Sequence, residues 1–501
     1  MKDNLKNYEL IRKRINAFSF SSFLAYWDSE TEAPLECFSN RSKQIGILNE
    51  LAYNLKTSKE TISIINILYK NRHKLNQQLN HEICEFKRDL LTMKKIPINE
   101  YIAYQELLAY SFNIWLKAKK ENNFLFFLPT LEKIVNYNKQ FIKYQETKSL
   151  KGYDVLLNRY VNGFKIKDYD KLFLELKETL VPFIYEVSKQ KLPYNDNFLN
   201  FQYSKEKQKQ FINYLHSVLQ FDTSRGLTKE SEHPFTISFG PSDVRYSNHF
   251  YEDNLCSGIF AALHELGHAL YEQQVSLDLE DTLSWGGGSM ALHESQSLFY
   301  EQMIGRSKAF WNQHFPVLKS IFKKEFKGVT IKDFYHHINT VKPSLIRIEA
   351  DELTYPIHIM IRYDIEKALF ANQITVKDLP IIWKEKIKEY LNIDVPSDKE
   401  GILQDMHWAG GMFGYFPTYA LGAAYAAQIF NTMNKEFNVY SSLKNKNTEE
   451  INYWLKINLH QYGSTKDPKS LFKHVAKENF NPKYYVKYLK NKYTKIYNSK
   501  N

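Results

Sequence analysis

The chain has 501 residues, a formal net charge of +11 and 15% aromatic residues. Its basic residues are spread along the whole length without an arginine-rich stripe, so the positive balance does not predict a nucleic-acid partner. No run reaches the roughly 18 apolar residues of a membrane span, and three scattered cysteines without a CxxC pair predict a reducing, cytoplasmic location.

Residues 1 to about 225 are predicted to form successive amphipathic helices. One example is the segment in which apolar side chains recur at spacings of three, three and four residues: Ile45, Leu48, Leu51 and Leu55. The whole chain has only 18 Gly and 15 Pro among its 501 residues, about 7% together. These two types usually make up roughly 12% of residues. Few helix breakers over so long a chain predict a mainly helical fold.

The N-terminal segment Ala17–Trp27 follows Arg12-Lys13-Arg14 in the manner of a signal peptide. Serines interrupt it and no small-x-small cleavage site follows, so a buried helix is predicted instead. We find no internal repeat, low-complexity tract or linker. The chain is therefore predicted to be one domain over residues 1–501, which can divide into a helical wall at 1–225 and a catalytic half at 226–501.

A small β-hairpin is predicted where the pattern changes. His233 to Phe239 alternates apolar and polar residues, as a strand does, and Val244 to Ser247 can form the second strand. The Gly-Pro-Ser-Asp sequence between them has turn chemistry. Such a hairpin offers an edge strand to an extended peptide. A helix over about 255–275 follows, with Asp253 or Asn254 at its N-cap.

The most informative motif lies in this helix. His264 and His268 are four residues apart, which returns them to nearly the same helix face, so both imidazoles can bind one metal ion. Glu265 stands beside them, where it can take a proton from a water on the metal. Small residues that allow close packing of a second helix surround the motif: Ala261, Ala262, Gly267 and Ala269.

A catalytic zinc site usually has three protein ligands, so one ligand is missing from this motif. Glu294 is the best candidate, early in a helix that follows Gly286-Gly287-Gly288, can be capped by Ser289 and ends near Gly305. His293 is the rival ligand, because adjacent helical residues point about 100° apart and only one of them faces the metal.

Zinc is the predicted metal, and cobalt or manganese can substitute because the filled d-shell of zinc imposes no geometry. A non-catalytic protein with a structural zinc is disfavoured. Structural sites are closed by four protein ligands, often cysteines, and only Cys256 lies near this motif.

Arginines are the candidates for recognising a free C-terminus, since a guanidinium binds a carboxylate through two parallel hydrogen bonds. Arg245 lies in the second predicted strand. Arg347 is predicted to begin a helix with a polar stripe at offsets of 4, 7, 11 and 15: Asp351, Thr354, His358 and Arg362. A stripe of this kind is either a solvent-facing surface or part of a site, and Pro356 predicts a kink or break within it.

The end of the chain, Lys483 to Lys500, is rich in lysine and tyrosine. Without a further signal, this tail is predicted to be a solvated helix.

Together these motifs resemble the carboxypeptidase Taq-type metallocarboxypeptidases. The resemblance covers essentially the whole chain and rests on motifs in the family's order: Tyr26 to Thr31, His233-Pro234-Phe235 (HPF), Asp243 to Ser247 (DxRxT, with Ser247 in place of Thr), His264 to His268 (HExxH), His293 to Gln296 (HES(Q/G)), Ile346 to Asp351 (IRxxAD), Gly401 to Trp408 (GxxQDxHW) and Gly414 to Tyr419.

The resemblance implies a mostly helical, saddle-like body with a deep substrate groove and a small sheet beside the metal helix. It implies a homodimer that removes single residues from peptide C-termini with broad specificity. The residues that it maps onto metal ligands are His264, His268 and Glu294, with Glu265 as the catalytic glutamate.

For substrate binding, the resemblance maps Arg347 onto a position that binds the substrate carboxylate. Arg245 and Gln404 lie in motifs linked to limiting substrate reach, and His233 of the HPF motif is a further candidate for substrate binding. His407, Tyr415 and Tyr419 are candidates for the groove or for an oxyanion site. An oligopeptidase or dipeptidase with the same metal centre is the alternative, and the sequence separates it from a carboxypeptidase only through the arginines.

Overall fold

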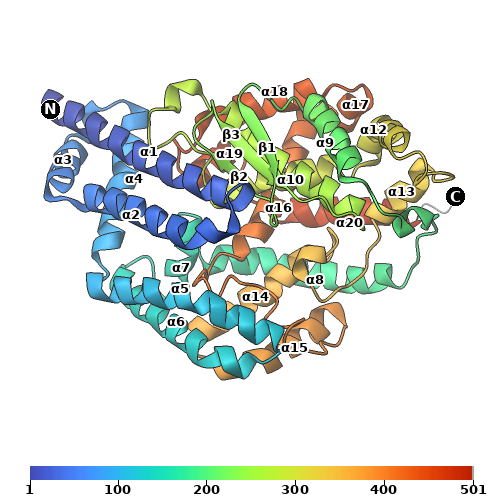
Figure 1. Ribbon diagram of the computed structural model, residues 1–501, viewed down its shortest axis with the longest axis horizontal. Helices are drawn as coiled ribbons and strands as arrows, with labels where there is room; N and C mark the ends of the chain where they lie inside the picture. The colour runs from blue at the N-terminus through green and yellow to red at the C-terminus, as the bar shows by residue number, and fades with distance from the viewer. Residues whose placement is uncertain (499–501) are drawn as a thin grey trace.

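The computed structural model describes residues 1–498, without the side chains of residues 35 and 39. It consists of helices around one small sheet (Figure 1). In chain order the α-helices are α1 (Lys2–Thr31), α2 (Phe38–Thr57), α3 (Lys59–Lys70), α4 (Gln77–Lys94), α5 (Ile98–Lys120), α6 (Phe124–Gln145), α7 (Tyr153–Tyr160), α8 (Ile166–Ser188), α9 (Lys205–Leu219), α10 (Leu255–Gln274), α11 (Met290–Leu298), α12 (Lys308–Ile321), α13 (Ile331–Ile338), α14 (Tyr355–Phe370), α15 (Leu379–Leu391), α16 (Pro417–Glu436), α17 (Val439–Lys444), α18 (Thr448–Asn458), α19 (Pro468–Ala476) and α20 (Lys483–Asn498).

The first nine helices confirm the prediction of a helical N-terminal part. Helix α8 illustrates why they form, because its buried side chains recur along one face: Tyr169, Leu172, Phe173, Leu176, Leu180, Ile184 and Val187. The predicted burial of Ala17–Trp27 is only partly correct. The segment lies in α1, but Phe20 and Phe23 are 45% and 42% exposed because this part of the helix borders a cleft rather than the core.

The core consists of two hydrophobic clusters. The larger cluster extends from Tyr104 to Tyr497 and therefore crosses residue 225, while a smaller one joins α1, α3 and α4 through residues such as Tyr8, Ile65 and Ile83. The C-terminal helix belongs to the larger cluster. One face of α20 is buried against the core, so the prediction of a solvated helix is wrong for that face.

The sheet has three strands, β1 (Gly226–Glu230), β2 (Thr236–Ser238) and β3 (Val244–Asn248), in the order β1-β3-β2. Strands β2 and β3 form the predicted antiparallel hairpin, with Ile237 opposite Arg245. Strand β1 was not predicted and pairs in parallel with β3. Strand β2 is consequently an edge of the sheet, and it packs beside α10.

No helix between residues 1 and 498 combines the length and the apolar character needed to span a bilayer.

Candidate metal centre

Two closely packed helices, α10 and α11, form the framework of the centre. Helix α10 begins at the predicted place, where the Asn254 side chain accepts a hydrogen bond from the Ser257 amide at 3.1 Å. Gly267 faces α11, and a Cβ at this position would lie 2.5 Å from the carbonyl oxygen of Gln296. The predicted close approach of a second helix is therefore confirmed at Gly267, where only glycine leaves enough space.

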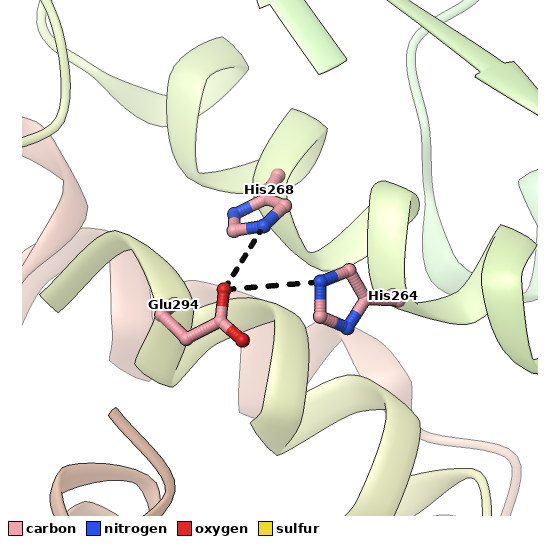
Figure 2. A group of neighbouring side chains, drawn as sticks. All are labelled: His264, His268 and Glu294. Atoms are coloured by element: carbon pink, nitrogen blue, oxygen red, sulfur yellow. Dashed lines mark ion pairs between the residues drawn. The ribbon is translucent and has the colours of Figure 1, made fainter. Parts of the chain in front are cut away.

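The structure brings together His264, His268 and Glu294, here called the metal group (Figure 2). One ligand atom of each lies within 4.8 Å of the others. Glu294 Oε2 lies 3.8 Å from His264 Nε2 and 3.5 Å from His268 Nε2. Ligands placed about 2.0–2.2 Å from a tetrahedral zinc ion are about 3.3–3.6 Å apart. The geometry and the two-imidazole, one-carboxylate donor set therefore fit a divalent metal such as zinc.

His293, the rival ligand, lies outside this group. Its Nδ1 is 2.6 Å from Nδ1 of His268, and its Nε2 is 2.7 Å from Glu272 Oε1. Glu272 also accepts a hydrogen bond from the Gly287 amide at 2.9 Å. His293 thus contacts the Nδ1 side of His268, and Glu272 contacts His293 in turn. Contacts of this kind fix the ring of a metal-binding histidine.

His264 has an equivalent support. Its Nδ1 lies 3.0 Å from Oε2 of Glu301, whose other carboxylate oxygen is 3.4 Å from Arg306 Nη2. Burial raises the pKa of Glu301, but the contacts with His264 and Arg306 outweigh it and lower the pKa overall. Glu301 lies in a π-helical segment, Phe299–Ile304, which continues α11 to the predicted end near Gly305.

Sequence reasoning missed both supporting carboxylates. A signal was present, because Glu272 follows His268 by four residues and Glu301 follows Glu294 by seven, so each lies on the same helix face as a residue of the metal group.

Glu265 is buried and faces the edge strand. Its Oε2 accepts a hydrogen bond from Thr236 Oγ1 at 2.6 Å, a contact that the sequence did not predict. Burial raises the pKa of Glu265. Burial also raises the pKa of Glu294, to about 7, and the nearby charges of Glu301 and Glu265 contribute. Carboxylates crowded in this way are suited to a bound cation, which would offset their repulsion.

The polar stripe that begins at Arg347 is neither one helix nor a solvent-facing surface. Arg347 lies in a short 3₁₀ turn, Arg347–Glu349, and α14 begins only at Tyr355 with Pro356 in its first turn. Asp351 interrupts the helix, because its Oδ1 accepts hydrogen bonds from the amides of Leu353 and Thr354, both at 3.0 Å. The residues of the stripe are nevertheless brought together and mostly buried.

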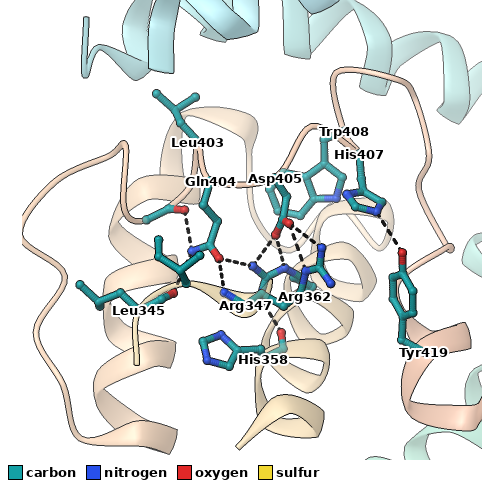
Figure 3. A network of polar contacts seen from close by, with 12 residues as sticks. Leu345, Arg347, His358, Arg362, Leu403, Gln404, Asp405, His407, Trp408 and Tyr419 are labelled. Atoms are coloured by element: carbon teal, nitrogen blue, oxygen red, sulfur yellow. Dashed lines mark hydrogen bonds and ion pairs between the residues drawn. The ribbon is translucent and has the colours of Figure 1, made fainter. Parts of the chain in front are cut away.

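Two arginines of this stripe share one carboxylate (Figure 3). Asp405 Oδ1 lies 3.0 Å from Arg347 Nη2, and Asp405 Oδ2 lies 2.7 Å from Arg362 Nε. Burial raises the pKa of Asp405, but the two guanidinium groups lower it far below its usual range. Burial also lowers the pKa of neighbouring His358 to about 3, so this imidazole is neutral. Arg347, Arg362 and Asp405, here called the arginine cluster, therefore carry a net charge of +1.

Gln404 forms hydrogen bonds with both arginines. Its Oε1 accepts hydrogen bonds from the Arg347 amide and from Arg362 Nη2, both at 2.9 Å. Its Nε2 donates to carbonyl oxygens of Leu345 and Gly401 at 3.1 and 3.2 Å. Because both ends of its amide are occupied within the protein, Gln404 can act on a substrate only through the arginines.

Aromatic rings line the face of Arg347. Tyr355 OH accepts a hydrogen bond from Arg347 Nη1 at 3.2 Å, and the ring centroid of Tyr419 lies 5.3 Å from the guanidinium carbon. Tyr419 in turn contacts His407, with 3.5 Å between the hydroxyl and Nε2, and its ring packs edge-on against Tyr415. Burial lowers the pKa of His407 to about 4. The sequence-predicted residues His407, Tyr415 and Tyr419 are thus grouped around Arg347, and Tyr355 joins them.

The structure does not bring Arg245 or His233 to this cluster. Arg245 forms two parallel hydrogen bonds with Asp243, at 2.8 and 2.6 Å, and lies over the ring of Phe239. His233 is exposed. The hydroxyl of Ser247, which stands where the resembled motif has Thr, accepts a hydrogen bond from the Phe235 amide at 3.1 Å, so the substitution keeps the link between the two motifs.

A cleft of about 740 Å³ separates α1 and α4 from the segment after α10. Phe20 and Phe239 lie in its wall, and so does Gly287, where a Cβ would lie 2.9 Å from the ring of His293. The cleft therefore reaches the segment beside His293, next to the metal group.

Comparison with known proteins agrees with this geometry. The family model described as carboxypeptidase Taq (M32) metallopeptidase matches residues 7–493. Carboxypeptidase 1 of Bacillus subtilis (strain 168) is 39% identical over 493 residues, which cover 98% of this chain and 98% of that protein. Thermostable carboxypeptidase 1 of Thermus thermophilus is 32% identical over 491 residues, with 95% of each chain covered. The crystal structure of an M32 carboxypeptidase from Deinococcus radiodurans R1 matches with a TM-score of 0.95 at 28% identity over 99% of both chains. The chain belongs to the carboxypeptidase Taq (M32) metallopeptidase family.

Proposed function

We propose that this protein is a metal-dependent carboxypeptidase that hydrolyses the C-terminal bond of peptides with broad specificity. Zinc, or cobalt or manganese in its place, would be held by His264, His268 and Glu294. The convergence of these three side chains is the observation that carries the proposal. When bound, such a metal polarises the scissile carbonyl and lowers the pKa of a coordinated water.

Glu265 is proposed to be the general base. Thr236 donates to Oε2, and no residue among 1–498 hydrogen-bonds to Oε1, so that oxygen is available to accept a proton from the attacking water. The raised pKa of Glu265 makes the carboxylate a better base than an exposed glutamate. Because Thr236 lies on an edge strand, the same strand can pair with an extended peptide while it holds the base.

Arg347 is proposed to bind the terminal carboxylate of the substrate. Arg347 and Arg362 carry two positive charges against the single charge of Asp405, and a substrate carboxylate would balance the remaining one. The rings of Tyr355 and Tyr419 contact Arg347 and narrow the space around it. An anion is favoured here over the neutral amide of an internal peptide segment.

Other predicted residues have more distant roles in this proposal. His407, Tyr415 and Tyr419 line the carboxylate site, and Gln404 fixes the arginines. Arg245 and His233 act on substrate reach from the hairpin rather than at the metal.

We also propose a homodimer of single-domain chains that works in the cytoplasm on peptides alone, without nucleic-acid or membrane partners. The three cysteines, Cys37, Cys84 and Cys256, are all unpaired, which supports a reducing compartment. A principal core that crosses residue 225 supports a single domain with two lobes, 1–225 and 226–501, on a shared core.

The deciding experiment compares a peptide with a free C-terminus and the same peptide amidated, with products followed in time by mass spectrometry. A carboxypeptidase shortens the free peptide one residue at a time from its end and leaves the amide intact. Equal cleavage of both peptides at internal bonds would instead favour an oligopeptidase, and release of dipeptides or cleavage of dipeptides alone would favour a dipeptidase-type enzyme.

A further inference from the structure

A second large cavity lies between α12, α16, α17 and α20. Its volume is about 760 Å³, within the range of roughly 300–1,000 Å³ that small-molecule sites occupy. None of its lining residues belongs to the metal group or to the arginine cluster. Figure 1 shows α12, α17 and the C-terminus at the end of the molecule opposite α1–α4. The cavity is therefore separate from the peptidase site.

The charged side chains that line this cavity are all basic. Five lysines line it: Lys308, Lys444, Lys487, Lys492 and Lys495. Lys492 is neutralised by the buried carboxylate of Glu352, with which it forms an ion pair. The other four are exposed and have no ion pair or hydrogen bond within residues 1–498. Among these residues no Asp or Glu lines the cavity. Four uncompensated charges around one cavity favour a ligand with several negative charges.

The cavity also offers flat apolar surfaces. Phe430, Tyr440 and Tyr488 line it as a group, with 5.3 Å between the ring centroids of Phe430 and Tyr440 and 6.0 Å between those of Phe430 and Tyr488. Tyr484 adds a fourth ring. Aromatic faces of this kind stack on planar heterocycles, which lysines alone would not select.

One hydrogen-bond donor in the wall has no partner. Asn431 Nδ2 is buried, yet nothing within residues 1–498 accepts a hydrogen bond from it. Buried donors are nearly always paired in native proteins, so this one is available to an acceptor in the cavity, such as one on a ligand.

The sequence of the C-terminal helix explains how lysines and rings come to share one surface. Tyr485, Leu489 and Tyr493 are buried in the core and fix the helix. The adjacent face carries Tyr484, Lys487, Tyr488, Lys492 and Lys495, at spacings of three and four residues. The lysine- and tyrosine-rich tail thus has one face for the core and a neighbouring face for the cavity.

We propose that this cavity binds a nucleoside phosphate. Its phosphates would lie among Lys308, Lys444, Lys487 and Lys495, and its base would stack on the aromatic group around Phe430. The side chain of Asn431 would donate to an acceptor on the base or the phosphate.

Calorimetric titration of the metal-loaded protein with ADP, pyrophosphate and adenosine tests the proposal. We expect saturable binding of ADP, with pyrophosphate and adenosine each at least tenfold weaker, because each contains only half of the recognised chemistry. Peptidase activity measured in parallel reports any loss of metal to pyrophosphate. Absence of ADP binding at millimolar concentration would overturn the proposal, as would pyrophosphate binding that equals ADP binding.

A matched pair of double variants locates the site. Lys308→Gln with Lys487→Gln should weaken ADP binding at least tenfold. Lys120→Gln with Lys133→Gln removes the same charge from exposed positions on α5 and α6 and should change it less than twofold. Equal weakening by both pairs would mean that ADP responds only to net charge and would refute the cavity as its site. If the first pair does not fold, Tyr484→Ala in the wild-type background provides the same comparison.

Discussion

The surroundings of Glu265 fit the role of general base that we propose for it. Thr236 occupies one carboxylate oxygen, burial raises the pKa, and His264 of the metal group precedes Glu265 in α10. The edge strand and the helix thus both contribute to this environment. A substitution that keeps the shape of the side chain and removes only its basicity therefore isolates the chemical role.

The first prediction concerns Glu265→Gln. Glutamine keeps the size of the side chain and can still accept the hydrogen bond from Thr236, but it cannot take up a proton. We expect kcat to fall by about 10²–10⁴-fold, the usual contribution of a general base, while metal content per chain is unchanged. Metal analysis beside a peptidase assay measures both. Glu449→Gln, at an exposed position on α18, serves as the control, and a Glu265→Gln variant with wild-type turnover would exclude this residue as the base.

The second prediction concerns Arg347→Ala. The substitution removes the guanidinium group that is proposed to bind the substrate carboxylate. Arg362 still neutralises Asp405, so no buried charge is left without a partner. Hydrogen bonds to charged groups contribute about 1.5–3 kcal/mol, so kcat/KM for free-acid peptides should fall by about 10–100-fold. Cleavage of amidated peptides should stay at its low level. The preference for free-acid over amidated peptides should therefore become smaller.

Arg14→Ala, on the exposed surface of α1, is the control for the loss of an arginine. An unchanged ratio of kcat/KM between acid and amide substrates in Arg347→Ala would show that the carboxylate binds elsewhere. The melting temperature of the variant distinguishes this outcome from a general loss of folded protein.

At the scale of elements, the contact between α10 and α11 decides whether the metal group can form. Glu294 reaches the two histidines only because Gly267 lets the helices approach, and helix α16 approaches Glu294 from the other side at Gly422, where a Cβ would lie 2.7 Å from Glu294 Cγ. Two glycines thus set the distances among three helices.

The third prediction compares two glycines in helices. Gly267→Ala inserts a methyl group 2.5 Å from backbone atoms that cannot rotate away, so we expect the free energy of unfolding to fall by about 1–3 kcal/mol. Gly46→Ala in α2 meets no atom within 4 Å and should raise it by about 0.5–1 kcal/mol, because alanine is the better helix former. Thermal unfolding of both variants measures the contrast. Equal shifts of the same sign would contradict the packing argument.

Local patterns predicted the elements that depend on local periodicity. The spacing of His264 and His268 predicted one face of α10, and the alternation after His233 predicted the hairpin, because helix and strand periods are properties of neighbouring residues. Strand β1 was missed because its short polar sequence gains its conformation from parallel pairing with β3, a contact that no local pattern encodes. The helix predicted from Arg347 failed where the Asp351 side chain competes with the helical hydrogen bonds.

The site was predictable to a similar extent. The residues of the metal group follow from spacing together with family motifs, whereas the excess charge around Arg347 depends on Asp405, which comes from a distant segment. Thr236 could not be assigned from its sequence position, because its role depends on how the sheet edge docks against α10.

At the scale of the whole molecule, Glu366 joins segments from both parts of the chain. Its carboxylate accepts hydrogen bonds from Tyr153 OH at 2.6 Å, from Trp408 Nε1 at 2.7 Å and from the Gly414 amide at 2.6 Å. Tyr153 begins α7, while Trp408 and Gly414 belong to the segment that carries Asp405. Glu366 therefore links the segment that carries Asp405 to α7, alongside the hydrogen bonds that Trp115 and Lys119 of α5 donate to Leu403 and Gln404.

The fourth prediction follows from the pKa of this group. Burial raises the pKa of Glu366 from 4.5 to about 7, although its three hydrogen bonds oppose the shift. Between these two values the folded chain binds more protons than the unfolded chain, so the contribution of Glu366 to stability is full below about pH 4.5 and is lost as pH rises through 7. A shift of this size corresponds to about 3 kcal/mol.

Glu366→Gln cannot titrate, so the difference in unfolding free energy between wild type and variant should shrink by about that amount from pH 4.5 to pH 8. Urea unfolding at several pH values measures this difference, and effects of the metal centre cancel because both proteins contain it. Glu449→Gln, at an exposed position on α18, is the control for the loss of a carboxylate. A pH-independent difference for Glu366→Gln would contradict the prediction, because it would mean that the three hydrogen bonds offset burial and leave the pKa of Glu366 near its value in the unfolded chain.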